Sequence, residues 1–248
     1  MGNLAFSYDG LGRYADALKL REETLALRKA KLGPDHPHTL TSMHDLANSY
    51  SALGRHADAL KLHEETLALM KAKLGPDHPD TVRSMSSVAE SLVKLERGAE
   101  AVPVIDDCVQ RAAGKDVDSG LLPGVMDLRL RHFEQAKDAA GCRQTAEMWE
   151  KLNRADAPSL YTAARMRAVT AAVFRSTPGA DAARLAEEES DRAMAWLKQA
   201  VAAGYKDAAQ MRQDKDLDPL RERDDFKKLL VELEQKAPSN EKLHETSR

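Results

Sequence analysis

The chain has 248 residues, of which 42% are hydrophobic, 31% charged and only 4% aromatic, with a formal net charge of -3. This balance excludes the broad basic surface of a nucleic-acid-binding protein and the polybasic segment of a membrane-surface protein. No apolar run approaches the roughly 18 residues of a membrane span, and no secretory signal opens the chain, so we expect a cytoplasmic protein with no nucleic-acid or membrane partner.

A 42-residue repeat dominates the first half of the chain. Residues 1–42 and 43–84 align position for position and differ at 11 of the 42 positions. A weaker third copy begins at Met85. A period of this length indicates structural repeats that stack on their neighbours.

Each copy contains the pattern of two helices. In the second copy the first helix has an apolar stripe at helical spacing, made of Leu40, Met43, Leu46, Ala47, Tyr50 and Leu53. Gly54 ends this helix, and Gly75 ends the second helix. We expect Asp77 to cap the helix that follows. The predicted helices span residues 37–53, 55–73, 79–95 and 97–113. One helix pair cannot bury both of its stripes, so each pair needs a neighbour.

The pattern predicts four segments. Residues 1–113 are three regular repeats, 114–124 a loop, 125–236 divergent helix pairs with a closing helix, and 237–248 a disordered tail. Within the divergent part, helices are expected at 158–175, 181–203 and 223–235. The first copy lacks its cap and opening turn, so we expect a fragment or a start assigned too late; the alternative is a true start with a frayed helix.

Residues 1–102 resemble tetratricopeptide repeats of the 42-residue kinesin-light-chain type. The resemblance rests on Leu46-Ala47, Tyr50, Gly54-Arg55, Ala59 and the Leu-Gly-Pro-Asp-His-Pro linker. It implies an all-α fold, a right-handed superhelix of stacked antiparallel helix pairs. The second helix departs from the family pattern: Arg21 and His63 replace an aromatic residue, and Thr24 and Thr66 replace alanine. These departures indicate altered packing between helices, not another fold.

A second resemblance covers about residues 125–236. The segments Ala193–Ala200, Gly204-Tyr205, Asp216–Arg221 and Asp225–Leu230 are similar to the tail that follows such repeats in bacterial serine/threonine protein kinases. A kinase domain would precede such a tail. The glycine-rich loop, His-Arg-Asp and Asp-Phe-Gly strings of a kinase do not occur in this sequence.

No other motif places a nucleophile beside a base, so we expect no catalysis and no cofactor. The histidines His36, His38 and His78 lie in linkers one repeat apart and lack a cysteine cluster, so we interpret them as turn and cap residues, not metal ligands. Cys108 and Cys142 form no C-x-x-C pair and are expected to be buried, reduced thiols.

The resemblance implies that the first helices of the pairs line a concave groove that recognises peptides. The candidate groove residues lie opposite the core stripe: Asn3, Phe6, His44, Asp45, Asn48, Ser51, Ser86, Ser87 and Glu90. Asn48 stands where an asparagine amide holds an extended peptide. No lysine or arginine pair is predicted beside it, which argues against a clamp for a terminal carboxylate. Asp45 and Glu90 favour a basic ligand; the alternative is that all these residues are simply solvated.

We therefore predict a non-catalytic scaffold that binds a partner protein or peptide in this groove. One alternative is the substrate- or partner-selecting tail of a truncated serine/threonine kinase. Another is a structural segment that self-associates through the uncapped end at Met1.

Overall fold

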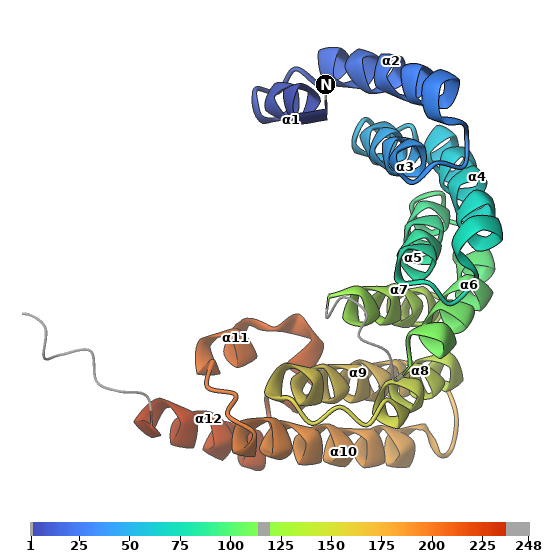
Figure 1. Ribbon diagram of the computed structural model, residues 1–248. Helices are drawn as coiled ribbons and strands as arrows, with labels where there is room; N and C mark the ends of the chain where they lie inside the picture. Colours follow the sequence, from blue (N-terminus) through green and yellow to red (C-terminus); the bar gives the residue numbers. More distant parts are fainter. Residues whose placement is uncertain (1, 114–119, 237–248) are drawn as a thin grey trace, which may run out of the picture. The chain divides into compact units, whose positions relative to one another are not determined.

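The structure is a computed structural model that describes residues 2–113 and 120–236, and these residues form helices and turns without any strand (Figure 1). They divide into two compact units, Met1–His132 and Phe133–Arg248. We call them unit 1 and unit 2. The predicted tail at 237–248 lies outside the described residues, as do residues 114–119 of the predicted loop.

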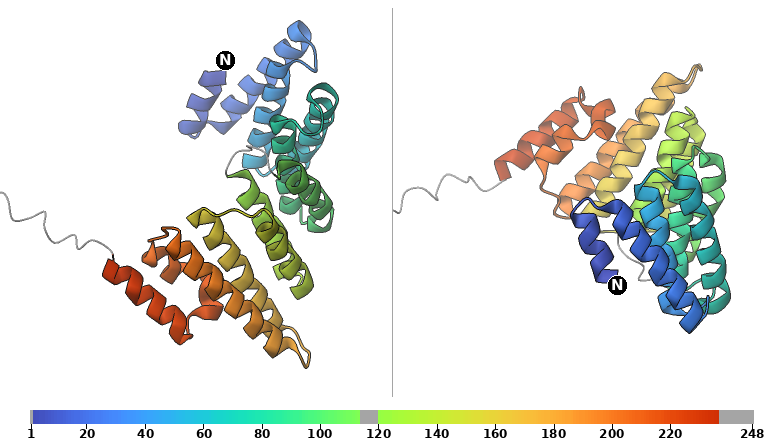
Figure 2. Two further views of the ribbon diagram at one scale, coloured as in Figure 1. Left: turned by 60° about the horizontal axis from the view of Figure 1, so that its bottom comes forward. Right: turned by 90° about the horizontal axis from the view of Figure 1, so that it is seen from above.

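The helices of unit 1 follow one another as packed neighbours along the chain. They are α1 (Gly2–Gly10), α2 (Tyr14–Leu32), α3 (Pro37–Ala52), α4 (His56–Leu74), α5 (Pro79–Lys94), α6 (Gly98–Ala112) and the start of α7 (Leu121–Gln135). Within this unit α1, α3 and α5 form an inner layer, and α2, α4 and α6 form an outer layer (Figure 1). Figure 2 shows the same succession from two further directions. The four helices predicted between residues 37 and 113 agree with α3–α6 to within one residue at each end.

The loop predicted over residues 114–124 ends earlier than expected, because α7 begins at Leu121. Pro123 lies in the first turn of α7, where the missing N–H breaks no helical hydrogen bond. The helix is tied to α6 within unit 1 by Arg129, whose Nε donates to Asp106 Oδ1 over 2.8 Å. The Pro123-Gly124 pair therefore lies in the first turn of a helix and does not mark the end of the loop.

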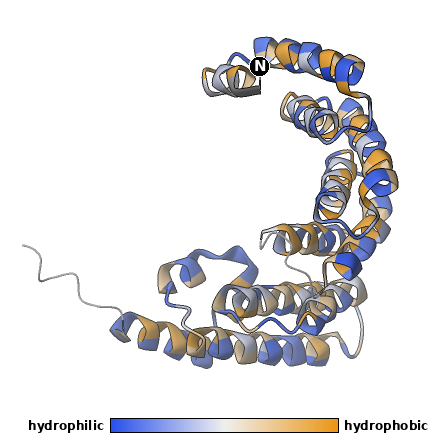
Figure 3. Ribbon diagram, viewed as in Figure 1, coloured by the Kyte–Doolittle hydropathy of each residue, from blue (hydrophilic) through white to orange (hydrophobic). Residues whose placement is uncertain are grey.

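Successive helix pairs are joined by shared apolar burial. Figure 3 shows polar and apolar residues alternating around the helices of unit 1. One cluster joins α2, α3 and α4 and contains the buried residues Leu25, Leu40, Met43, Leu46 and Met70. Burying a leucine or methionine side chain of this kind contributes about 2 kcal/mol. The predicted stripe from Leu40 to Leu46 therefore faces both the preceding helix and its own partner, whereas Leu53, which was expected in the same stripe, is exposed at the end of α3.

The linkers between pairs are capped by histidines, which corrects the prediction for Asp77. The Nδ1 atom of His78 accepts a hydrogen bond from Asp80 N over 3.2 Å, and His36 accepts from His38 N over the same distance. An imidazole nitrogen replaces the usual carboxylate or hydroxyl acceptor at the helix start. The turn-and-cap interpretation of these histidines is therefore confirmed.

The two linker aspartates instead bind cations on later helices. Asp35 Oδ2 lies 2.9 Å from Lys73 Nζ on α4, and Asp77 Oδ1 lies 2.9 Å from Arg111 on α6. The hydrogen bond and charge of Lys73 hold the pKa of Asp35 below its ordinary value. Each linker is thereby fixed to the outer helix of the next pair.

The described part of unit 2 is built around two long antiparallel helices. Its elements are α8 (Ala139–Lys151), α9 (Ala157–Ser176), α10 (Ala182–Ala202), α11 (Ala208–Gln213), the 3-10 helix η1 (Lys215–Leu220) and α12 (Asp224–Lys236). The predicted helices 158–175, 181–203 and 223–235 agree with α9, α10 and α12 to within one residue at each end. The two short elements α11 and η1 were not expected; they begin after Asp207 and Asp214, whose carboxylates accept from the backbone.

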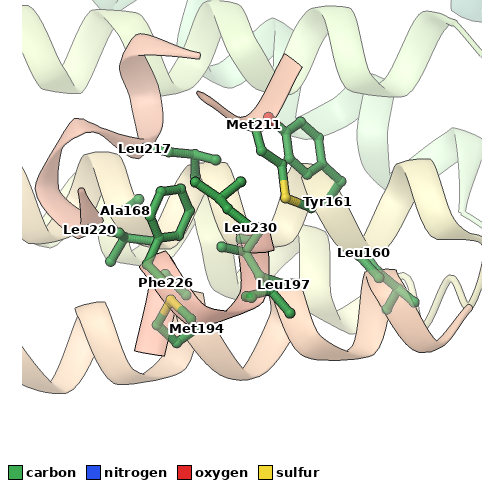
Figure 4. Close-up of a cluster of buried hydrophobic side chains, with 14 of the residues drawn as sticks. Leu160, Tyr161, Ala168, Met194, Leu197, Met211, Leu217, Leu220, Phe226 and Leu230 are labelled. Atoms are coloured by element: carbon green, nitrogen blue, oxygen red, sulfur yellow. The ribbon is translucent and has the colours of Figure 1, made fainter. Parts of the chain in front are cut away.

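The core of unit 2 joins all the elements from α9 to α12. Figure 4 shows Phe226 and Leu230 of α12 beside Met194 and Leu197 of α10. Leu217 and Leu220 of η1 complete this cluster and are fully buried. The closing function predicted for the last helix is consistent with this packing, because its apolar face covers α10 and η1.

A buried ion network links α8, α9 and α10. Arg167 donates to both carboxylate oxygens of Glu150 over 2.7 and 2.6 Å and to Glu189 Oε2 over 2.8 Å. Arg143 Nε donates to the other oxygen of Glu189, and Trp196 Nε1 donates to Glu150. Glu189 is completely buried. Its charge is tolerated only because two guanidinium groups satisfy it.

The turn within each pair of unit 1 needs a residue with left-handed backbone. The first two copies place Gly12 (φ 71°) and Gly54 (φ 74°) there, and the third copy has Glu96 (φ 60°). A side chain in this conformation strains the backbone, whereas glycine adopts it freely.

Both cysteines are buried and form no disulfide, as predicted. Burial raises the pKa of the Cys108 thiol to about 11. In the described residues no helix combines the length and the hydropathy needed to cross a membrane.

Replacing Glu96 by glycine should raise the free energy of unfolding by roughly 0.5 to 1 kcal/mol, because it removes the left-handed strain. The matched change Gly54→Glu should lower it by a similar amount. Urea unfolding followed by circular dichroism measures both. A loss of stability in Glu96→Gly would contradict the assigned backbone conformation.

Replacing Glu189 by glutamine should lower the stability of unit 2 by about 3 kcal/mol, because the buried Arg167 and the partly exposed Arg143 lose their shared counter-charge. Its neighbour Glu188 pairs with Arg184 at the surface, so Glu188→Gln is the matched control and should change the stability by less than about 1 kcal/mol. Thermal and urea unfolding of the two variants test the difference. Equal losses would show that the network contributes nothing beyond an exposed pair.

Candidate functional site

The predicted groove residues are carried by the inner-layer helices α1, α3 and α5 of unit 1. The side chains of Asn3 and Phe6 lie outside the described part of the structure. The other seven fall into three groups by exposure and by the partners they have, and only one group is available to a ligand.

Three predicted residues are exposed and unpartnered. Asp45 and Asn48 lie one turn apart on α3, and Glu90 lies on α5. None of the three side chains forms a hydrogen bond or ion pair with another residue in the described part of the chain. Their polar atoms are therefore free to bind a ligand.

Two predicted residues are turned inward. Ser86 and Ser87 are only 6% and 8% exposed. Their hydroxyls donate to the carbonyl of Arg83, over 2.7 Å from Ser86 and 3.4 Å from Ser87. Each hydroxyl is hydrogen-bonded to a carbonyl of its own helix, so neither serine presents its hydroxyl to the groove. Residues opposite the core stripe were expected to be exposed. This expectation is wrong for Ser86 and Ser87, because more of the circumference of α5 than of α3 is buried.

The remaining two residues connect the helices of unit 1. Ser51 Oγ accepts a hydrogen bond from Lys94 Nζ of α5 over 2.9 Å. The ring of His44 lies against that of His63 of α4, with 5.5 Å between centroids. Burial lowers the pKa of His44. Both residues contribute to contacts between helices as well as to the surface.

The exposed pair on α3 lines a cavity of about 340 Å³ between α2 and α3. The cavity is bounded by Tyr14, Arg21, Asp45, Asn48, Ser49, Ala52 and Leu53. It brings an amide, a carboxylate, a guanidinium and an aromatic ring together.

Tyr14 and Arg21 were not predicted from the sequence, because they lie on the second helix of their pair. One arginine, Arg21 of α2, lines the cavity together with Asn48, so the expectation that no lysine or arginine pair lies on the face of Asn48 is not contradicted. The replacement of the family's aromatic residue by Arg21 was a usable signal, because a charged side chain needs either a polar partner or contact with solvent.

The aligned position in the next copy is occupied by His63, which is 2% exposed. Its Nδ1 lies 3.0 Å from Ser91 Oγ, and its Nε2 has no hydrogen-bond partner within the described chain. Burial, helped by His44 and Lys94, lowers the pKa of His63 to about 4. The ring is therefore neutral at pH 7 and has a structural rather than a chemical role.

Unit 2 contains a cavity of about 360 Å³ beside Trp149 and Trp196. The indole N–H groups of both residues are already used, by the carbonyl of Ser159 and by Glu150. The acidic residue that lines this cavity, Glu150, forms an ion pair with Arg167. Across the described residues no group of histidine, cysteine or acidic side chains is arranged to hold a metal ion.

These features define a class: an α-helical repeat whose inner helices present unpaired polar side chains. The tetratricopeptide-repeat family model matches residues 1–72 and 46–112. Residues 1–112 therefore contain tetratricopeptide repeats, a fold that generally serves as a protein-interaction scaffold. None of the curated proteins compared matches the sequence.

Solved structures show the same fold over more of the chain. A putative kinesin light chain with nearly identical repeats from Podosopora anserina is 22% identical, with a TM-score of 0.57 over 86% of this chain and 95% of that one. A single-residue variant of that protein gives a TM-score of 0.59 at the same identity and coverage. BtubC (BKLC) from P. vanneervenii is 18% identical, with a TM-score of 0.58 over 82% of this chain and 79% of that one. The predicted all-α fold of stacked tetratricopeptide-repeat helix pairs is thereby confirmed.

The stability of unit 1 should depend on pH through His63. Because the pKa of this histidine is lower in the folded chain than in the unfolded chain, its contribution is complete above about pH 6.5 and is lost as the pH falls toward 4. The loss should reach about 3 kcal/mol. His63→Phe should flatten the curve of unfolding free energy against pH in this window, whereas Ser91→Ala should keep the slope. An unchanged slope in His63→Phe would contradict this assignment.

Proposed function

We propose that unit 1 binds a partner protein or peptide through the surface formed by Asp45, Asn48 and Glu90 together with Tyr14 and Arg21. We call these five residues the Asn48 surface. The observation that supports the proposal most directly is that Asp45 and Asn48 are unpartnered within the described chain and line one cavity with Tyr14 and Arg21.

The chemistry of the cavity suits a peptide in extended conformation. The amide of Asn48 can donate to a carbonyl and accept from an N–H of the same peptide unit. The ring of Tyr14 is half exposed, at 51%, and offers an apolar contact beside these polar groups. An extended segment exposes both backbone groups, so it can use the amide and the ring together.

The charges of the Asn48 surface favour a ligand with basic residues. Asp45 and Glu90 both present carboxylates without a counter-ion in the described structure. Arg21 lines the same cavity on its α2 side. Charge pairs at such an exposed rim contribute more to the rate of association and to specificity than to affinity.

The comparisons support the coarser part of this proposal. The repeats that match the family model include every residue of the Asn48 surface. Two of the similar structures are described as kinesin light chain, a name that applies to those proteins. The kinase-tail and self-association hypotheses remain predictions, because no observation in the structure favours either.

The double variant Asp45→Ala with Asn48→Ala should weaken partner binding at least tenfold, because it removes the carboxylate and the amide at once; this corresponds to about 1.4 kcal/mol. The melting temperature should stay within about 2 °C, since both side chains are exposed. Peptides selected from a random displayed library on the wild-type chain supply the ligands, and calorimetry measures their affinities.

The matched control is Lys61→Ala with Glu64→Ala, two exposed residues on the outer helix α4. This variant should bind the selected peptides as the wild-type chain does. Equal binding by the Asp45/Asn48 variant would remove the Asn48 surface as the site.

A further inference from the structure

A second cavity of unit 1 lies where the end of α4 meets α3 and the start of α5. Its volume is about 160 Å³. Its apolar wall includes Leu40, Met70 and Leu74, and its polar wall includes His44, Asp80 and Ser84. We call it the Met70 cavity.

The polar wall contains an unsatisfied group. Ser84 is 2% exposed, and its Oγ has no hydrogen-bond partner within the described residues. A buried hydroxyl without a partner costs about 1 to 3 kcal/mol. The hydroxyl lies at the boundary of the cavity, where a ligand could reach it.

The first copy of the repeat shows how the same place is filled. Ser42 is the counterpart of Ser84, and its Oγ accepts a hydrogen bond from Arg28 over 2.6 Å. The same nitrogen of Arg28 also donates to the backbone carbonyl of His38 over 2.9 Å. In the second copy Met70 stands at the position of Arg28, so the guanidinium is missing while both of its acceptors, Ser84 Oγ and the carbonyl of Asp80, are retained.

We propose that the Met70 cavity receives the side chain of an arginine from the partner. Its guanidinium would donate to Ser84 Oγ and to the carbonyl of Asp80, as Arg28 does with the two counterparts in the first copy. The aliphatic stem of the ligand would pack on Met70 and Leu74. The near-identity of the two copies makes the first a template for the second.

The charges around the cavity are compatible with a guanidinium. Asp80 lies on the polar wall, and its carboxylate is 2.9 Å from Arg83. This pairing neutralises the one cation that lines the cavity. His44 adds no positive charge at pH 7, since burial lowers its pKa. Arginine fits better than lysine, because the residue that fills the corresponding place in the first copy is Arg28 and a guanidinium is less strongly hydrated than an ammonium group.

The inference deepens the proposed function, since it assumes a partner and names one of its side chains. The Met70 cavity shares no residue with the Asn48 surface, so the two can be tested separately.

The probe is N-acetyl-L-arginine methylamide, titrated into the full chain and followed by NMR. The reporters are the methyl groups of Leu40 and Leu74, which all the variants below retain, and the backbone amide of residue 84, which is present in each of them. We expect saturable shifts of these signals, as a single side chain binds with millimolar affinity. The matching citrulline derivative has nearly the same shape without the charge and should bind at least fivefold more weakly.

Met70→Arg places in the second copy the residue that the first copy already holds, so the variant should fold and fill its own cavity. We expect at least tenfold weaker binding of the arginine derivative. Arg28→Met makes the opposite change in the first copy and should leave the shifts at Leu40, Leu74 and Ser84 unchanged. Ser84→Ala, which removes the hydroxyl alone, should weaken binding and leave the stability equal or higher.

Equal shifts in the wild-type chain and in Met70→Arg, or no shift of the three reporters, would overturn the arginine assignment. Equal binding of the arginine and citrulline derivatives would overturn it as well. In each case the effect of the Asp45/Asn48 variant on selected peptides still decides the proposed function, so the two failures are distinguishable.

Discussion

Burial of the apolar face of each helix pair against the next pair is the constraint on which unit 1 depends. Leu40, Met43 and Leu46 of α3 are buried in one cluster with Leu25 of the preceding helix and Met70 of the following one. No pair can satisfy this requirement alone. Leu25, Met43 and Leu46 have the same residue type in the first two copies, whereas Leu40 is replaced by Val82 and Met70 by Arg28. The exposed Asp45 and Asn48 lie outside these contacts and also differ between the copies.

The two near-identical copies show how single differences change a surface without changing the fold. At the position shared by residues 21 and 63, one copy has an arginine that lines a cavity and the other has a buried, neutral histidine. At the position shared by residues 28 and 70, an arginine that binds its own repeat is replaced by a methionine. Both differences lie on outer helices, which therefore shape the inner surface as much as the inner helices do.

The sequence predicted the fold well because its signals were local and repeated. The Gly-Pro linkers and the helical spacing of leucines place α3–α6 within one residue of their observed ends. The site was predicted less well, because exposure depends on which neighbours a helix meets. Asp45 and Asn48 were placed correctly on an exposed face, whereas Ser86 and Ser87 occupy the same kind of position on α5 and are buried. Arg21 and Tyr14 were missed because a cavity between helices cannot be read from the periodicity of one helix.

The helices of unit 2 are held together by interactions that differ from those of unit 1, since the sequence of unit 2 departs from the strict repeat. Two carboxylates and two guanidinium groups lie at the junction of α8, α9 and α10. A buried network of this kind is costly to desolvate and adds little net stability compared with well-packed apolar residues. Its effect is on specificity: Arg167 can satisfy Glu150 and Glu189 together in only one arrangement of the three helices, so a register shift would leave a buried charge unpaired. In the regular copies a shared apolar stripe fixes the register of the helices, whereas in the divergent segment matching charges fix it.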